Sequence, residues 1–300
     1  MNRCLAFVLG GGGARGAMQV GALRALIEAG FKPDLLVGTS IGAVNATGLA
    51  HWGVDLAGIQ ALEQAYRQVA FSNLMDPRLA RLTLCALSGR PNHHASRRVS
   101  EFLIAEGITL DLRFDQITHV RLALIGADLA SGHPMIYSQD QGQSILEGLL
   151  ASIAVPPWFA PVEKDSQYIV DGGALSNLPI EPALTMGATE IIALDLNDPS
   201  PMPENGRSLE QSLGKLVFAV IHRQVCLETA LAEAQGVPVH YIELRSSPPI
   251  PIWDFSHHRE LLQIGYEIAS RMIPGWVKTG QPEFELSSPI TENQPCWEFA

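Results

Sequence analysis

The sequence predicts an α/β fold in which a mostly parallel central sheet is covered by helices on both faces. Short apolar runs of strand length alternate with longer segments of helical periodicity through the first half of the chain. Such alternation favours parallel strands joined by helical crossovers. Hydrophobic residues make up 47% and charged residues 17% of the 300 residues, which is the composition of a well-packed globular protein.

The expected strands are apolar runs that end at glycine or at a polar residue. The first, at 4–9, leads into a run of glycines, and the second, at 34–37, leads into a serine flanked by glycines. Further strands are expected at 120–127, 135–137, 168–170, 190–196 and 239–244. Helices are expected at 15–29, 41–70, 209–235 and 256–272, and proline-rich loops at 198–206 and 247–253.

Segment 71–100 departs from this alternation. Pro77, Gly89 and Pro91 interrupt its apolar stretches, so we expect an inserted helical cap there. The apolar stretch at 71–90 and the aliphatic face of 209–235 could line an acyl channel or touch a bilayer. Packing in the core is the expected role of both.

Charge and cysteine content limit the possible partners. A net charge of −11 argues against nucleic acid, but it leaves open a neutral lipid interface. The cysteines at 4, 85, 226 and 296 lack metal-ligand spacing, so we interpret them as reduced thiols of a cytoplasmic protein. The first ten residues are expected to form a strand rather than a signal peptide. No apolar run of about 18 residues free of proline and charge predicts a membrane span.

Ser40 stands in the most informative stretch, Gly38-Thr39-Ser40-Ile41-Gly42, between an apolar run and a small-residue helix. Gly38 and Gly42 leave room for a sharp strand-to-helix turn, which lifts the serine hydroxyl to the positive end of the helix. This placement is typical of a nucleophile.

A glycine run, Gly10 to Gly13 followed by Ala14-Arg15-Gly16, comes directly after the first strand. Its successive amides could hold the phosphate of a dinucleotide, because Gly11, Gly13 and Gly16 fit G-x-G-x-x-G. Alternatively, they could form an oxyanion hole beside Ser40. Arg15 could assist there or could form a salt bridge at the start of a helix. The end of the second strand lacks the acidic residue that a dinucleotide site requires.

Asp171 ends an expected strand and is followed by Gly172 and Gly173, which leave backbone room around its carboxylate. Alone, an Asp-Gly pair indicates a turn. Beside a nucleophile and an anion-binding loop, it becomes a candidate base. Asp128 and Asp195 also end strands, but glycine pairs do not follow them, and capping roles are expected for both.

Taken in order, these motifs resemble the patatin-like phospholipase family. Gly-Gly-Gly-x-Arg-Gly is followed about 25 residues later by Gly-x-Ser-x-Gly and then by Asp-Gly-Gly, as in that family. The stretches 151–162 (Ser-x-Ala-x-Pro-x-x-Phe-x-Pro-Val) and Asn177-Leu178-Pro179 also agree. The resemblance covers 5–196, the expected core domain. Segment 197–300 is expected to be a helical part packed on the same domain.

The resemblance implies a serine acyl hydrolase with a Ser40–Asp171 dyad, an oxyanion hole at Gly11, Gly12, Gly13 and Arg15, and neither metal nor cofactor. The expected partner is a lipid or other acyl ester, with possible peripheral contact with a membrane; the oligomeric state stays open. A Ser–acid–His triad remains formally possible through His222, His240, His257 or His258, although the last two are expected to form a solvated helix start.

Two other classes of function stay open. One is a non-catalytic lipid-binding or regulatory protein on the same fold, and the other is a nucleotide-binding enzyme that uses the glycine loop. A pH profile should separate the dyad from a triad, because an unperturbed carboxylate base stays active down to about pH 4 and imidazole to about 6.5.

Overall fold

A computed structural model describes residues 3–72, 93–156, 158–164, 167–196 and 209–278. Five strands run parallel in the order β3-β2-β1-β7-β8. Their bounds are β1 Leu5–Leu9, β2 Leu35–Thr39, β3 Arg121–Asp128, β7 Glu190–Asp195 and β8 Val239–Glu243. Antiparallel strands extend the sheet beyond β3, namely β4 His133–Tyr137, β5 Val162–Lys164 and β6 Gln167–Asp171.

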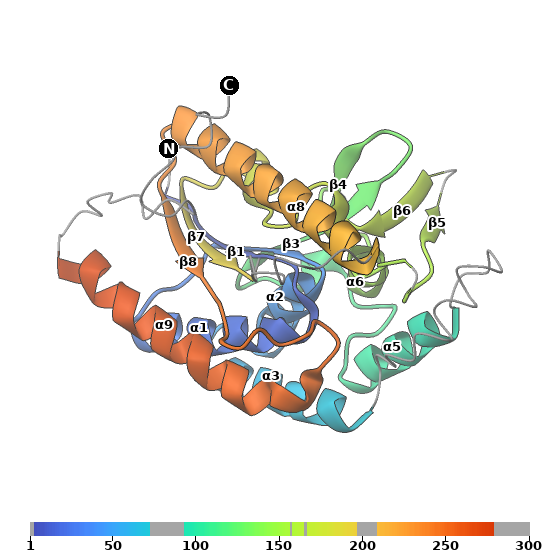
Figure 1. The fold of residues 1–300 in the computed structure, drawn as a ribbon, viewed down its shortest axis with the longest axis horizontal. Helices are drawn as coiled ribbons and strands as arrows, with labels where there is room; N and C mark the ends of the chain where they lie inside the picture. Colours follow the sequence, from blue (N-terminus) through green and yellow to red (C-terminus); the bar gives the residue numbers. More distant parts are fainter. Residues whose placement is uncertain (1–2, 73–92, 157, 165–166, 197–208, 279–300) are drawn as a thin grey trace.

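Helices lie on both faces of this sheet (Figure 1). One face carries α1 Gly16–Glu28, α2 Ile41–Trp52, α3 Leu56–Ser72, α6 Ile145–Ser152 and α9 His258–Lys278. The other carries α7 Ile180–Thr185 and α8 Leu209–Ala234, and α5 His93–Ala105 lies beside α6. The predicted fold class, a mostly parallel sheet with helices on both faces, is confirmed.

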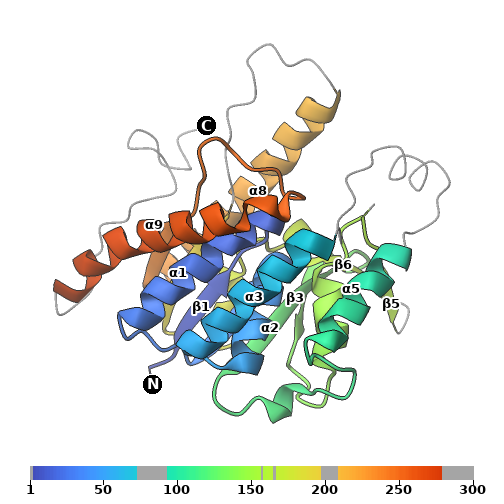
Figure 2. The same ribbon diagram turned by 90° about the horizontal axis from the view of Figure 1, so that it is seen from below.

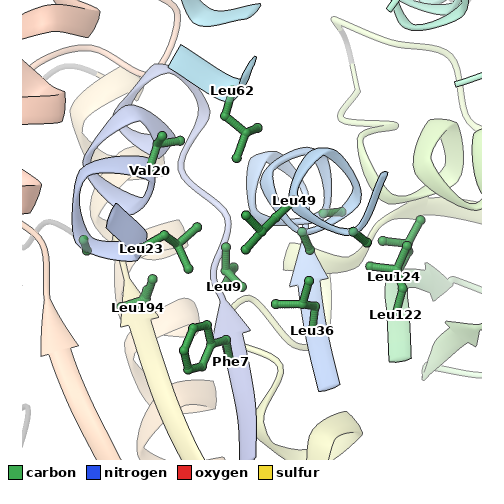
Figure 3. Close-up of a cluster of buried hydrophobic side chains, with 14 of the residues drawn as sticks. Phe7, Leu9, Val20, Leu23, Leu36, Leu49, Leu62, Leu122, Leu124 and Leu194 are labelled. Atoms are coloured by element: carbon green, nitrogen blue, oxygen red, sulfur yellow. The ribbon is translucent and has the colours of Figure 1, made fainter. Parts of the chain in front are cut away.

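The side chains of the central strands alternate between two hydrophobic clusters, as the two-residue period of a strand requires. In β1, Leu5, Phe7 and Leu9 belong to the cluster under α1 and α2, whereas Ala6 and Val8 belong to the one under α7 and α8. Figure 3 shows the first cluster, in which leucines from α1, α2 and α3 meet the strands. Two buried faces explain why these strands are apolar throughout.

The last part of the chain contributes α9, which crosses α1 at two glycines. A β-carbon on Gly21 would come within 1.9 Å of the carbonyl oxygen of Leu262, and one on Gly265 within 1.9 Å of that of Met18. The two backbones are therefore in direct contact. Helix α9 also extends past the predicted end, through Pro274.

The sequence-based analysis missed three short elements, β5, α6 and α7. A three-residue strand and a six-residue helix are too short for a periodicity to register. For α6 a signal was present, because Ser144 precedes an apolar run and its hydroxyl accepts a hydrogen bond from the amide of Glu147 at 3.5 Å.

The expected core role of the aliphatic face of α8 is wrong for its N-terminal half. Leu216, Val217 and Val220 are 59%, 57% and 48% exposed. In Figure 2 this half of the helix projects beyond the sheet. Of the expected cap, 73–92 lies outside the described residues, and 93–100 begins α5. Within the described part of the chain, none of the helices is long and apolar enough to cross a membrane.

Candidate active site

Ser40 occupies a strained turn between β2 and α2. Its backbone has φ 56° and ψ −125°, and a positive φ is uncommon for a residue with a β-carbon. The turn is tight because α2 starts at once: a β-carbon on Gly38 would lie 2.4 Å from the carbonyl oxygen of Gly42, and one on Gly42 would lie 2.1 Å from that of Leu9. Gly38 and Gly42 must therefore be glycines, because a β-carbon at either position would clash with the backbone.

Ser152 supports this turn, a role that the sequence reasoning missed. The amide of Ser40 donates to Ser152 Oγ at 3.1 Å, and the Ser152 hydroxyl donates to the carbonyl oxygen of Ile125 at 2.6 Å. Ser152 is fully buried, so its two bonds fix the strained turn to β3. The signal was present in the Ser-x-Ala stretch, which the resemblance singled out without assigning a role.

The pairing of β3 brings Asp171 to Ser40. Along one edge of β3, Ile125 pairs with Thr39 of β2, and the next residue, Gly126, pairs with Asp171 of β6. The same β3 residues pair with β4 on the opposite edge, so β2 and β6 share one edge and approach each other end to end. The residue after Thr39 and the last residue of β6 therefore meet.

The carboxyl group of Asp171 is held in a nearly dry environment. It is 7% exposed, and burial raises its pKa to about 6, although hydrogen bonds from the Ser40 hydroxyl and the Gly173 amide act to lower it. Oδ1 accepts the Gly173 amide at 2.7 Å, whereas Oδ2 is buried without a well-directed partner among the described residues. A carboxylate with a pKa of about 6 that lies within reach of the Ser40 hydroxyl is suited to accept its proton.

Of the predicted glycine pair after Asp171, Gly172 is required by contact with backbone, and Gly173 lies close to side-chain oxygens. A β-carbon on Gly172 would lie 2.3 Å from the carbonyl oxygen of Ile125, and one on Gly173 would lie 3.0 Å from Oδ1 of Asp171. The turn can therefore fold back onto β3 and cover the carboxylate.

The glycine loop lies beside Ser40 because β1 and β2 are parallel neighbours, with Leu9 opposite Gly38. A β-carbon on Gly11 would come within 3.1 Å of the β-carbon of Ser40. The prediction that Gly11 donates to an oxyanion is wrong for its amide, which donates to the carbonyl oxygen of Asn177 at 3.0 Å. Among the described residues, the amides of Gly12 and Gly13 have no partner, so they remain the candidate donors.

The side chain of Arg15 bonds to the backbone of this loop. Its Nε donates to the carbonyl oxygen of Gly12 at 3.3 Å. That carbonyl and the amide of Gly13 belong to one trans peptide unit and point in opposite directions. By holding the carbonyl, Arg15 fixes the direction of the candidate oxyanion donor. Gly16, the last predicted motif glycine, lies against Ile41, where a β-carbon would come within 2.4 Å of Cγ1.

A sequence model of the patatin-like phospholipase family matches residues 7–184, which include all of these motifs. The chain belongs to this family.

Relatives of this patatin-like chain are longer proteins. Patatin-like phospholipase domain-containing protein 7 of Mus musculus is 26% identical over 300 residues, covering 93% of this chain and 21% of the relative. An uncharacterized NTE family protein of Mycobacterium tuberculosis (strain CDC 1551 / Oshkosh) is 33% identical over 197 residues, which cover 65% of this chain and 30% of the relative. The chain thus spans less than a third of either. VipD of Legionella pneumophila has a solved structure with a TM-score of 0.43 and 14% identity, covering 91% of this chain and 67% of that chain.

Asn177 links the two halves of this patatin-like site. Besides accepting the Gly11 amide, it donates from Nδ2 to the carbonyl oxygen of Gly11 at 3.5 Å. Its Oδ1 would lie 2.9 Å from a β-carbon on Gly173. Asn177 is therefore bonded to the glycine loop and lies against the Asp-Gly-Gly turn, a position that the sequence reasoning quoted but did not assign.

A buried polar network anchors the other side of the glycine loop, and sequence reasoning missed it. Gln19 donates to the carbonyl oxygen of Gly10 at 2.8 Å, Asn45 donates to Gln19 at 2.9 Å, and the Tyr66 hydroxyl donates to Asn45 at 3.1 Å. These side chains come from α1, α2 and α3, so the loop is tied to three helices. Each residue separately resembles a helix-surface residue in the sequence, which is why the network was not found.

The candidate triad histidines bond elsewhere. His222 contacts Cys226 Sγ at 3.7 Å, His240 contacts Glu190 at 3.2 Å, and His257 contacts Glu260 at 3.2 Å. His258 Nδ1 lies 3.1 Å from the carbonyl oxygen of Phe255, and this residue is only 6% exposed. The expected solvated helix start is therefore correct for His257 and wrong for His258.

The two other strand-end aspartates have different roles. Asp128 accepts the amide of Ala130 at 3.0 Å, as a capping residue does. Asp195 is 2% exposed and accepts the Tyr241 hydroxyl, so its expected capping role gives way to a side-chain contact between β7 and β8.

Proposed function

We propose that this protein is a serine acyl hydrolase that cleaves carboxylic esters of lipids. The observation that carries the proposal is the end-to-end meeting of β2 and β6 on β3, which brings Ser40 to a buried carboxylate whose pKa is raised to about 6. Membership of the patatin-like phospholipase family supports it.

The reaction would proceed in two steps. Asp171 accepts the hydroxyl proton of Ser40 as Oγ attacks the ester carbonyl carbon, and the amides of Gly12 and Gly13 stabilise the negative oxygen that results. The tetrahedral intermediate then releases the alcohol, which takes the proton from Asp171, and the acyl group remains on Ser40. Asp171 then takes a proton from water as the water oxygen attacks the acyl carbon, and it gives this proton to Oγ of Ser40 as the bond to the acyl group breaks and the carboxylic acid leaves.

A covalent trap tests the proposal. An alkyl p-nitrophenyl phosphonate is expected to lose p-nitrophenolate and to leave one phosphonyl group on Ser40, measured as the mass of the intact protein and of the peptide that contains Ser40. The Ser40→Ala variant should gain no mass. A folded wild-type protein that gains no mass, or gains it at another residue, would favour the non-catalytic lipid-binding alternative.

The nucleotide-binding alternative receives little support. A dinucleotide would place its pyrophosphate at the start of the helix after the glycine loop. Here that position is covered by the chain around Ile252, whose carbonyl oxygen accepts the amide of Ala14 at 2.7 Å and would lie 2.2 Å from a β-carbon on Gly13.

We further infer that α8 contacts the surface of the lipid substrate. Leu216, Val220, Leu227 and Leu231 recur at i, i+4, i+11 and i+15 and are all exposed, so they form one aliphatic stripe. An exposed stripe of this kind suits the boundary between lipid headgroups and acyl chains. The net charge of −11 favours zwitterionic over anionic lipids.

The double substitution Leu216→Ser with Val220→Ser is expected to lower binding to phosphatidylcholine vesicles at least tenfold, measured by co-sedimentation, because both methyl-rich side chains leave the interface. Leu110→Ser is the matched control, since Leu110 is 56% exposed and does not belong to α8. Unchanged binding to the vesicles would refute the inference. If the wild-type protein forms a dimer and the double variant does not, the stripe would instead bind a second copy of the chain.

A further inference from the structure

Helix α8 carries two polar side chains that bond to segment 172–181, which joins β6 to α7. Nε2 of Gln224 donates to the carbonyl oxygen of Ala174 at 2.8 Å. One helical turn later, Oε2 of Glu228 accepts the backbone amide of Glu181, also at 2.8 Å. Side chains four residues apart lie on one face of a helix, so this face of α8 holds the segment at two points.

Segment 172–181 also contacts each motif of the candidate active site. It begins directly after the candidate base. The hydroxyl of Thr39, the residue before the nucleophile, donates to the carbonyl oxygen of Ser176 at 2.9 Å. The amide of Gly11, in the glycine loop, donates to the carbonyl oxygen of Asn177 at 3.0 Å. The placement of this one segment therefore affects the base, the nucleophile turn and the glycine loop together.

Glu228 is an unusual residue for its position on α8. It is 6% exposed and lies between Val225 and Ala232, which both belong to the hydrophobic cluster under α7 and α8. Burial raises the pKa of Glu228 to about 7, while the amide of Glu181 acts to lower it and the charge of the Glu181 carboxylate acts to raise it. An apolar side chain would avoid the cost of burying a carboxyl group, so packing alone does not account for Glu228.

The hydrogen bond from Glu181 accounts for the carboxyl group of Glu228. The first amides of a helix have no acceptor within the helix, and Glu181 is the second residue of α7. An ionised acceptor forms a stronger hydrogen bond than a neutral one, so Glu228 fixes where segment 172–181 ends against α8. Glu228 also lies beyond 7–184, the residues that the family model matches, and so it is not one of the family motifs.

We propose that Glu228 and Gln224 are positioning residues of the candidate active site. They hold segment 172–181 against α8 and thereby keep Asp171 and the glycine loop aligned with Ser40. The proposal rests on the proposed function, and it adds two residues that act without touching the substrate. Displacement of a catalytic group by about 1 Å costs up to about a hundredfold in rate, so loss of either side chain should lower turnover.

Three substitutions on α8 test this role. Glu228→Leu removes the acceptor, Glu228→Gln keeps an acceptor oxygen, and Glu233→Leu makes the same change at an exposed glutamate of the same helix as a control. We expect Glu228→Leu to lower kcat for p-nitrophenyl acetate about tenfold with KM unchanged, because Glu228 does not contact the substrate. Glu228→Gln should recover most of that loss, and Glu233→Leu should show none. Gln224→Leu provides a second variant if Glu228→Leu does not fold.

Hydrogen exchange of backbone amides, measured by mass spectrometry in the Ser40→Ala background, does not depend on turnover. Glu228→Leu is expected to speed exchange in segment 172–181 and also in the glycine loop at 10–16, which Asn177 connects to that segment. Strand β8 also packs on α8, and its exchange should not change. Faster exchange in both segments, without turnover of any ester by the wild-type protein, would keep the link from α8 to the glycine loop and refute the hydrolase. Exchange that rises equally in β8, or a kcat that Glu228→Leu leaves unchanged in an active enzyme, would overturn the positioning role and keep the hydrolase.

Discussion

Asp171→Asn is expected to lower kcat for p-nitrophenyl ester hydrolysis by about 10²–10⁴-fold, because an amide cannot accept the proton of Ser40 and general base catalysis contributes a factor of this size. Ser40→Ala is expected to remove acyl-enzyme formation altogether. Both are measured as initial rates at saturating substrate. Only hydrolysis that is independent of the dyad should remain.

The double variant makes the test specific to a dyad. If the two residues act as a unit, Ser40→Ala with Asp171→Asn should be no slower than the slower single variant, because the second substitution removes nothing further. Multiplicative losses would mean that Asp171 acts by another route. Ser144→Ala, at a helix start remote from Ser40 in sequence, controls for unspecific loss.

Loss of folding is not expected to explain the effect of Asp171→Asn. Since the folded state raises the pKa of Asp171 from 3.8 to about 6, it binds the proton more tightly than the unfolded chain does. The stability gained from that proton is complete below pH 3.8 and is lost as the pH rises through about 6. The uncharged amide avoids this loss, so the variant should melt no lower than wild type at pH 7.

The sequence sufficed for features that a local pattern determines. Gly38 and Gly42 predicted the turn at Ser40 because no side chain fits at either position. The alternation of strands and helices predicted the parallel sheet. The meeting of β2 and β6 on one edge of β3 depends instead on pairings between residues more than 40 positions apart. Composition and periodicity carry no information about such a register. The motifs made Asp171 a candidate base, and the family resemblance paired it with Ser40.

Other features failed to be predicted because they depend on burial. The amide of Gly11 donates to the carbonyl oxygen of Asn177, which lies 166 residues away in the sequence. The aliphatic face of α8 has the same pattern whether a core lies beneath it or not, so periodicity could not show that Leu216 is exposed.

The burial of Asp171 also changes how kcat/KM is expected to depend on pH. An unperturbed aspartate would keep the enzyme active to about pH 4. Because burial raises the pKa of Asp171 to about 6, kcat/KM should begin to fall near pH 6 as the base becomes protonated. Below that point it should lose a factor of about ten per pH unit, reaching about a hundredfold at pH 4. The measurement is kcat/KM for a short ester from pH 4 to 8, with circular dichroism to show that the protein stays folded.

An acid limb near pH 6 falls in the histidine range, so its position alone does not separate the dyad from a triad. The distinction lies in which substitution removes it. The limb should persist in His257→Ala and in His258→Ala, because Nδ1 of each ring lies close to a group other than Ser40 or Asp171. A limb that disappears in either variant would identify imidazole as the base. In Val170→Thr a polar residue replaces an apolar neighbour of Asp171. A shift of the acid limb towards pH 4 in this variant would show that burial raises the pKa of Asp171, the cause on which the dyad mechanism depends.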